Sequence, residues 1–95
     1  MLDEQTAIRL ADLFGALSDP SRVRIIAELT QGEKNVSALA EAVGLSDSAV
    51  SHQLRGLRQM RLVRTRKEGR QVFYSLDDEH IADLYTRGLD HVQHG

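Results

Sequence analysis

The amino-acid sequence predicts a mainly α-helical domain that carries one β-hairpin. Over most of the 95 residues, apolar side chains recur at the spacing of a helix. Only residues 62–76 have the β-branched and aromatic composition of strands. Glycine or proline stands between most of the periodic stretches, where it ends a helix or makes a turn. Because no repeat, low-complexity tract or linker interrupts this order, we expect a single domain over residues 1–95.

The composition fits one small domain with a thin core. Hydrophobic residues make up 41% of the chain, but only two phenylalanines and two tyrosines are present, so dimerisation is expected to add burial. No apolar run approaches the roughly 18 residues that span a bilayer, and the N-terminal stretch MLDEQTAIRL lacks the features of a signal peptide. We therefore expect a cytoplasmic protein without a membrane partner. With no cysteine in the chain, any metal must be held by His, Asp or Glu.

The first two helices are predicted on either side of a Ser-Asp-Pro break. Residues 6–17 form the first helix, because their apolar side chains share one helical face. Pro20 fits the first turn of the second helix, with Ser18 or Asp19 as its cap. The apolar stripe of this second helix ends before a Gln-Gly pair.

Two further helices follow with a tight turn between them. Residues 36–43 form a short helix, and Gly44 is suited to the left-handed conformation that ends it. The next helix begins at the small polar residues from Ser46 and runs to about Met60.

After this helix the period changes to that of strands. Residues 62–66 and 71–76 are predicted to form a β-hairpin, with Gly69 in the turn between them. The closing segment, from residue 79 to about residue 92, is helical again. A helix, a tight turn, a second helix and a hairpin behind it make a winged helix-turn-helix.

In this fold the second helix of the pair lies in the major groove, and its first turns meet the base edges. The side chains on this helix that we expect to contact DNA are Ser48, Ser51, His52, Gln53 and Arg55. Basic side chains of the hairpin can neutralise phosphates, and those expected to do so are Arg66, Lys67 and Arg70. Each serine could instead cap the helix, and His52 could be merely solvated or buried.

The net charge of −2 conceals a basic segment. Six basic residues and one acidic residue lie between Arg58 and Arg70, which gives this segment +5 and leaves −7 for the rest. A basic patch on an acidic body suits a polyanion that is gripped at one face. A charge run by itself is more simply explained as a solvated loop, but this one coincides with the predicted wing, which favours double-stranded DNA.

Two stretches resemble the ArsR/SmtB family of metal-sensing bacterial repressors: ADLFGALSDPSRVRIIAEL and VSALAEAVGLSDSAVSHQLRGLRQMRLVRTRKEGRQVFYSL. The motifs ALSDPSR and SAVSHQL are the most specific to the family, and the resemblance covers nearly the whole chain. It implies a homodimer built from the first and last helices, with two recognition helices facing successive major grooves of an operator palindrome. It also implies repression that an inducer relieves, no enzymatic activity and no small organic substrate.

Three of the four histidines lie in the last helix. His91 and His94 are three residues apart and share a helix face. His80 lies on the same face but about 16 Å away along the axis, at ~1.5 Å per residue, so one helix cannot close a site around all three. An antiparallel partner helix across a two-fold axis would bring His80 of one protomer beside His91 and His94 of the other. With Asp77 or Asp78 near the N-cap, the Asp78 carboxylate can turn toward the same ion.

One carboxylate and three imidazoles make a four-ligand set that suits tetrahedral Zn²⁺, with Co²⁺ as a possible substitute. No open coordination position remains, so a regulatory or structural site is favoured over a catalytic one. The spacing Asp-x-His-x10-His-x2-His is similar to that of family members with a zinc site in the last helix. A histidine-rich end of the chain that binds no metal is the alternative.

Departures from the family pattern bear on which metal is bound. The stretch GEKNVSALAE lacks the cysteine-containing motif that many relatives use for arsenic, cadmium or lead, and no histidine lies near the start of the chain as in relatives that sense nickel. Both differences favour zinc, while a sensor of cobalt or nickel, or a repressor that answers a non-metal signal, stays the alternative. A zinc hydrolase would need an open metal position, and a zinc buffer would not use the basic wing.

We expect zinc and DNA to favour different placements of the two protomers, so that zinc releases the operator. The second ring nitrogen of His91 or His94 needs a partner. The family resemblance implies a backbone carbonyl near Met60 or Arg61, at the end of the recognition helix. Asp47, at the front of that helix, would be repelled by phosphate unless it caps the helix or accepts from a cytosine amino group.

Overall fold

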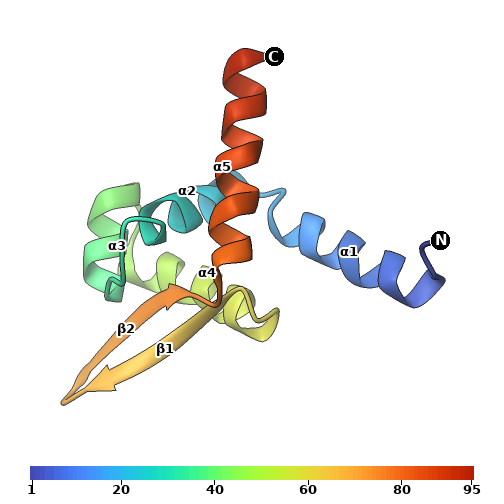
Figure 1. Cartoon of the computed structure of the whole chain (residues 1–95). Coiled ribbons are helices and arrows are strands. Elements are labelled where there is room, and N and C mark those ends of the chain that lie inside the picture. Colours follow the sequence, from blue (N-terminus) through green and yellow to red (C-terminus); the bar gives the residue numbers. More distant parts are fainter.

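The computed structural model describes residues 1–95 and confirms a mainly helical fold with one β-hairpin. Its elements, in chain order, are α1 (Glu4–Ala16), α2 (Pro20–Leu29), α3 (Val36–Val43), α4 (Asp47–Gln59), β1 (Val63–Glu68), β2 (Gln71–Leu76) and α5 (Glu79–His94) (Figure 1). The first helix begins two residues before the predicted start, and the last runs to His94. None of the helices has the length and apolar character needed to cross a bilayer.

A short polar side chain caps the start of every helix. The capping residues are Asp3, Asp19, Asn35, Ser46 and Asp78. Each accepts a hydrogen bond from a backbone N–H of the first turn, which would otherwise lack a partner. Gly44 ends α3 at φ 73°, in the left-handed conformation that glycine adopts without steric cost. These caps explain why the predicted helix boundaries agree closely with those of the structure.

The core lies between α2, α3 and α4. The most deeply buried side chains, all below 2% exposed, are Ile25, Ile26, Leu39, Val50, Leu54 and Leu57. The base of the hairpin and the first turn of α5 close this core through Leu62, Val63 and Ile81. No polar or charged residue is buried, so packing of apolar side chains accounts for the interior.

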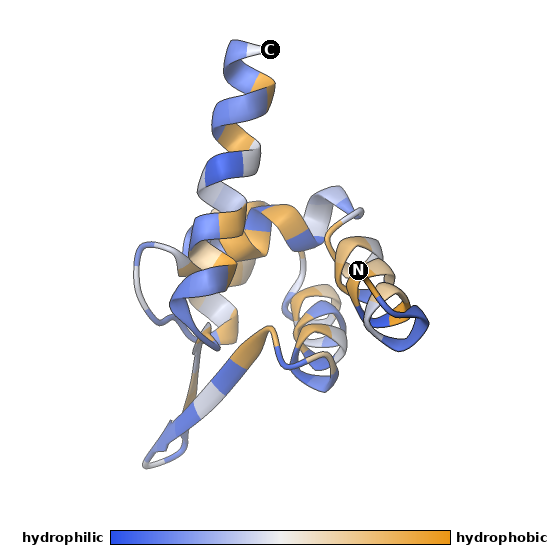
Figure 2. Cartoon of the chain, turned by 45° about the vertical axis from the view of Figure 1, so that its right-hand side comes forward, coloured by the Kyte–Doolittle hydropathy of each residue, from blue (hydrophilic) through white to orange (hydrophobic).

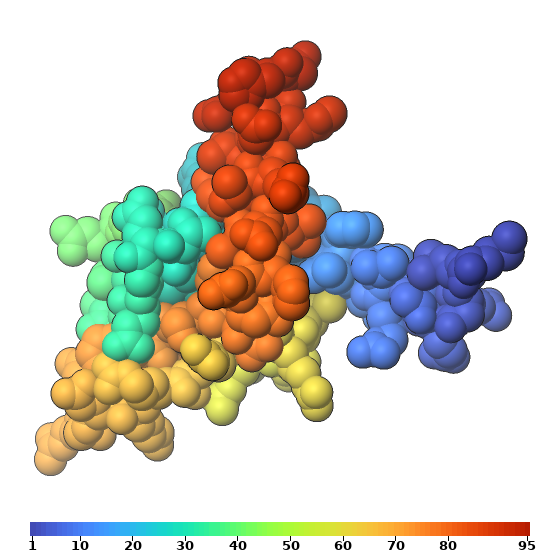
Figure 3. Space-filling model, viewed as in Figure 1, coloured from blue at the N-terminus to red at the C-terminus, as the bar shows by residue number.

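Two helical arms leave this core with apolar side chains in the open. Figures 1 and 3 show α1 and the C-terminal half of α5 projecting from the body in different directions. Ala16 is the only buried residue of α1, and Ile81 the only one of α5. Along both arms Figure 2 shows bands of hydrophobic residues, among which Phe14 is 55% exposed and Val92 is 73% exposed. A single chain therefore leaves apolar surface uncovered on both arms.

The hairpin is tied to the loop between α2 and α3, which the sequence did not predict. β1 and β2 pair antiparallel from Val63 opposite Leu76 to Glu68 opposite Gln71. On its other edge, β2 forms a bridge with this loop, because Lys34 and Tyr74 exchange two backbone hydrogen bonds of 3.0 and 2.8 Å. The wing is thus held at its base from two sides.

The junction between α4 and the wing holds a non-glycine residue in the left-handed region. Arg61 has φ 60°, and the bonds around it are those of a Schellman motif: Leu62 N donates to Leu57 O at 2.9 Å, and Arg61 N donates to Arg58 O at 3.0 Å. An L side chain at this φ crowds the backbone. The motif therefore ends α4 at a conformational cost.

Replacing Arg61 with glycine should relieve that cost. We expect Arg61→Gly to raise the free energy of unfolding by about 1 kcal/mol, measured by urea denaturation at fixed protein concentration. Arg61→Ala is the matched control, because it removes the same side chain and keeps a Cβ at positive φ. Equal stability of the two variants would show that strain at Arg61 is not the cause.

Candidate DNA-binding surface and metal ligands

The face of α4 opposite the core is open. Val50, Leu54 and Leu57 are fully buried. At about 100° per residue, Ser48, His52 and Arg55 lie on the other side of the helix, and all three are exposed. Ser51 is half-buried on the flank. Three of the five side chains on this helix that were predicted to contact DNA thus share one open face.

Gln53 has a different environment. It lies on the flank of α4 that faces α2, where its side-chain oxygen accepts a 2.7 Å hydrogen bond from Arg22 Nε. Because arginine only donates, this contact fixes which end of the amide points at Arg22. Arg22 also lies 3.5 Å from the carbonyl of Ala16, at the end of α1. The pair therefore links the recognition helix to α2 and to the end of α1.

The acidic residue at the front of α4 is accommodated within the chain. Ser46 caps the helix by accepting from Ala49 N at 3.1 Å, and Asp47 follows in the first turn. There the carboxylate lies near the positive end of the helix dipole and accepts a 3.1 Å hydrogen bond from Ser37 Oγ of α3. Asp47 thus joins α3 to α4 instead of capping.

The three basic side chains of the wing that were predicted to contact phosphate are not equivalent. Lys67 and Arg70 are exposed and form no ion pair. Arg66 donates to Glu33 of the α2–α3 loop through Nη2 at 2.5 Å and Nε at 3.2 Å, and to Glu68 through Nη1 at 2.7 Å. These hydrogen bonds hold the pKa of the Glu33 carboxyl below its usual value and raise the pKa of Arg66. Arg66 is therefore a charged group with two carboxylate partners before any DNA arrives.

The candidate metal ligands form two pairs at opposite ends of α5. Asp78 caps the helix through Oδ1, which accepts from His80 N at 2.9 Å and Ile81 N at 3.3 Å. Its other oxygen lies 3.5 Å from Nδ1 of His80. One carboxylate oxygen thus remains free of the cap and points toward the neighbouring imidazole.

At the other end of α5, Nδ1 of His94 lies 2.9 Å from a carboxylate oxygen of Asp90 and 2.9 Å from the Asp90 carbonyl. Sequence reasoning did not single out Asp90, although its i, i+4 spacing to His94 was a usable signal. His91 is exposed and borders a shallow polar hollow with Asp83 and Asp90. Both ends of the helix therefore present imidazoles to the surroundings.

Within one chain, no three potential ligands among His, Cys, Asp and Glu come together to hold a metal ion. The two pairs are at the start and near the end of the same helix. The donor chemistry fits a borderline-hard cation such as Zn²⁺. These residues can therefore form a complete four-ligand set only if one half comes from another α5.

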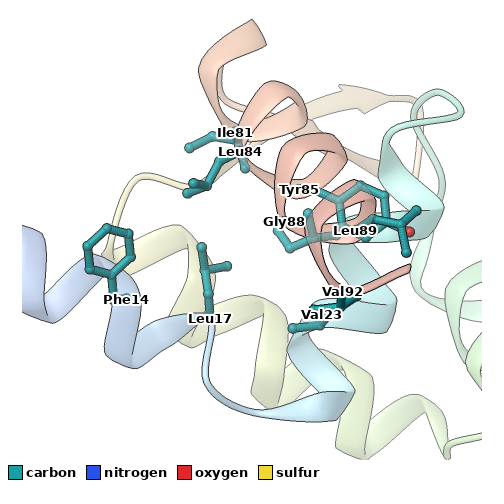
Figure 4. A pocket seen from close by; sticks show the side chains of 10 residues that line it. Phe14, Leu17, Val23, Ile81, Leu84, Tyr85, Gly88, Leu89 and Val92 are labelled. Atoms are coloured by element: carbon teal, nitrogen blue, oxygen red, sulfur yellow. The ribbon is translucent and has the colours of Figure 1, made fainter. Parts of the chain in front are cut away.

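An apolar groove lies between α1 and α5, with a volume of about 400 Å³. Figure 4 shows Phe14 and Leu17 on one side, across from the side chains of α5. The residues that line it are Phe14, Leu17, Val23, Ile26, Ile81, Leu84, Tyr85, Gly88, Leu89 and Val92. All but Gly88 are hydrophobic, so an apolar partner surface would fit here.

Comparison with known sequences matches residues 19–65 to the model of the bacterial regulatory protein, arsR family. Over 92% of its length, the chain is 51% identical to the transcriptional repressor SmtB homolog of Synechocystis sp., of which it spans 66%. It is 45% identical, over 98% of its length, to the HTH-type transcriptional regulator NmtR of Mycobacterium tuberculosis, of which it spans 78%.

A solved structure has the same fold as this chain. The homodimeric winged helix-turn-helix DNA-binding domain of Mb0332 from Mycobacterium bovis, a possible ArsR-family transcriptional regulator, is similar with a TM-score of 0.85 and 29% sequence identity. The match covers 98% of this chain and 88% of that one. The winged helix-turn-helix predicted from the sequence is confirmed.

The cap at α5 and the proposed ligand share one side chain, Asp78, and two substitutions can separate these roles. Without metal, Asp78→Ala should lower the free energy of unfolding by about 1 kcal/mol because the cap is lost, whereas Asp78→Asn should change it little. Urea denaturation in the presence of a chelator measures both. Equal destabilisation of the two variants would contradict the capping role.

Proposed function

Because the chain belongs to the ArsR family of bacterial regulatory proteins, we propose that it is a transcriptional repressor that binds operator DNA as a homodimer and releases it on binding Zn²⁺. The observation that carries this proposal is the placement of two incomplete ligand pairs at opposite ends of one projecting helix. Its relatives are transcriptional regulators, so the chain is not an enzyme.

A second copy of the chain is the partner that the apolar arms require. Phe14 on α1 and Val92 on α5 are more than half exposed, and both line the groove between the arms. Covering such surface by a copy of itself across a two-fold axis buries it on both protomers at once. The dimer would therefore be built from α1 and α5.

Antiparallel pairing of two α5 helices would complete two metal sites. His80 and Asp78 of one protomer would meet His91 and His94 of the partner subunit, and symmetry would repeat the arrangement. Asp78 keeps one carboxylate oxygen free of the cap, and the three imidazoles are exposed. Four N and O donors suit a tetrahedral Zn²⁺, which would tie the two helices in one relative placement.

DNA would be contacted by the open face of α4 and by the tip of the wing. Ser48, Ser51, His52 and Arg55 are available to base edges and phosphates. Lys67 and Arg70 supply free positive charge next to them. Gln53 and Arg66 are occupied by partners within the chain, so we assign them supporting roles.

The segment before α5 is hydrogen-bonded to the segment after α4, which offers a route from metal to DNA. Asp77 N donates a 3.0 Å hydrogen bond to Leu62 O, just after the Schellman motif. An antiparallel partner helix would bring its His91 to this junction. The carbonyls of Met60 and Arg61 accept no hydrogen bond within the chain, so either could accept one from that imidazole. Such a bond would move the recognition helix with the dimer.

A sensor of Co²⁺ or Ni²⁺, or a repressor with a non-metal signal, is the second candidate. It shares the family and the DNA-binding surface, and the exposed histidines leave room for another coordination number. Cobalt spectra discriminate between these candidates, because Co²⁺ reports its own geometry.

The proposal predicts intense tetrahedral bands when the protein is titrated with Co²⁺, saturating at one ion per protomer and erased by Zn²⁺. Operator DNA selected from random duplexes by the metal-free protein should bind at least about tenfold more weakly with zinc, as measured by fluorescence anisotropy. Asp78→Asn is the matched variant: it keeps the helix cap, so the fold should be unchanged, but it should weaken metal binding and therefore the effect of zinc on operator affinity. Weak octahedral bands would favour the cobalt or nickel sensor, and no bands would remove metal from the function.

The coupling route predicts that metal binding and DNA release can be separated at His91. We expect a substitution of His91 that keeps a metal ligand, but lacks the second ring N–H, to bind Co²⁺ tetrahedrally. Such a variant should bind operator equally well with and without zinc. Cysteine is suitable, because a thiolate can ligate and cannot donate. Normal release of DNA by His91→Cys would exclude this route.

A further inference from the structure

Arg66 occupies the centre of a cluster that joins the wing to the body. Its guanidinium donates to Glu33 with two of its nitrogens and to Glu68 with the third. It also lies over the ring of Phe73, 5.0 Å from the centroid, the residue opposite it in the hairpin register. All three nitrogens of the guanidinium are thus engaged, and one face is covered by an aromatic ring.

The charge of this cluster opposes a phosphate contact. One arginine lies between two carboxylates, so the three side chains together carry −1. A DNA phosphate approaching Arg66 would meet Glu33 and Glu68 as well, and would have to displace the two-point ion pair between Arg66 and Glu33. Isolated surface ion pairs contribute little, but bidentate networks are the exception.

The neighbouring lysine is free of this network. Successive side chains of a strand point to opposite faces, so Arg66 and Glu68 share one face of β1 while Lys67 points to the other. Lys67 has no ion pair, and neither has Arg70 in the turn. Strand geometry thus separates Lys67 from the cluster around Arg66.

A two-stranded hairpin needs such support. Hairpins of this size are marginal by themselves, and this one extends well away from the helices (Figure 1). Three ties hold it to the α2–α3 loop: the backbone bridge between Lys34 and Tyr74, the Glu33–Arg66 pair, and a 3.1 Å hydrogen bond from Asn35 to Gln71. Of these, the Glu33–Arg66 pair reaches the middle of β1.

We propose that Arg66 is a positioning residue that locks the wing at a fixed angle to α4, with Glu33 as its anchor. Of the three basic residues predicted to contact phosphate, Lys67 and Arg70 then do so and Arg66 does not. This inference rests on the proposed function only for its DNA arm, because the lock itself is a property of the free protein. Arg66 then does not contact DNA itself, but determines where the side chains that contact DNA lie.

Two measurements test the lock, one without DNA. In ¹⁵N relaxation of the metal-free protein, Arg66→Gln and Glu33→Gln should each lower the backbone order parameters of residues 66–72 from about 0.85 toward 0.6, while those of α4 stay unchanged. Lys67→Gln is the matched control and should leave the wing ordered. A wing that stays rigid in both Arg66→Gln and Glu33→Gln would overturn the proposal.

The second measurement is operator affinity against salt. Lys67→Gln should reduce the slope of log K against log salt by about 0.9, the value for one phosphate contact. Arg66→Gln and Glu33→Gln should each weaken binding a few-fold with the slope unchanged, and the double variant should be no worse than either single. A reduced slope in Arg66→Gln, or tighter binding in Glu33→Gln, would show that Arg66 contacts phosphate. If the wild-type protein selects no operator, the proposed function fails, and the relaxation experiment still decides the lock.

Discussion

Burial of one face of α4 against α2 and α3 is the contact on which the rest of the molecule depends. Val50, Leu54 and Leu57 have no exposed surface, so the helix cannot rotate without opening the core. The opposite face is thereby held outward with Ser48 and His52 on it. Because this small core packs only against one face of each of these helices, no part of the chain covers the exposed apolar side chains of α1 or of the far half of α5. The expectation of a second copy follows from the same packing.

α5 connects the two functions proposed for the chain. Its first turn is anchored in the core by Ile81, and the residue before its cap, Asp77, is hydrogen-bonded to Leu62, three residues after α4. Its far end projects from the body (Figure 3). A rigid helix transmits a displacement of its free end to the residues that anchor its other end. Asp78 is at that anchored end and serves as the cap, so the proposed metal ligand has its side chain already tied to the first turn of the helix.

The number of basic residues in the wing overstates the positive charge that is available to DNA. The basic segment has a surplus of positive charge in the sequence, yet Arg66 is neutralised by two carboxylates. Glu33, which lies outside the segment, therefore decides how much of that surplus is available to a polyanion. Net charge predicts attraction to DNA, but the contacts within the wing determine which side chains can supply it.

The sequence by itself determined the features that depend on near neighbours. Capping side chains set the helix starts, Gly44 and Gly69 set the turns, and helical periodicity put His80, His91 and His94 on one face, because each rests on interactions within a few residues. Only the tertiary structure decided that Gln53 bonds Arg22 and that Arg66 bonds Glu33, partners 31 and 33 residues apart. Several carboxylates and amides in the chain could have served those arginines equally well by chemistry. The choice was made by which segments the apolar core brought within hydrogen-bonding distance.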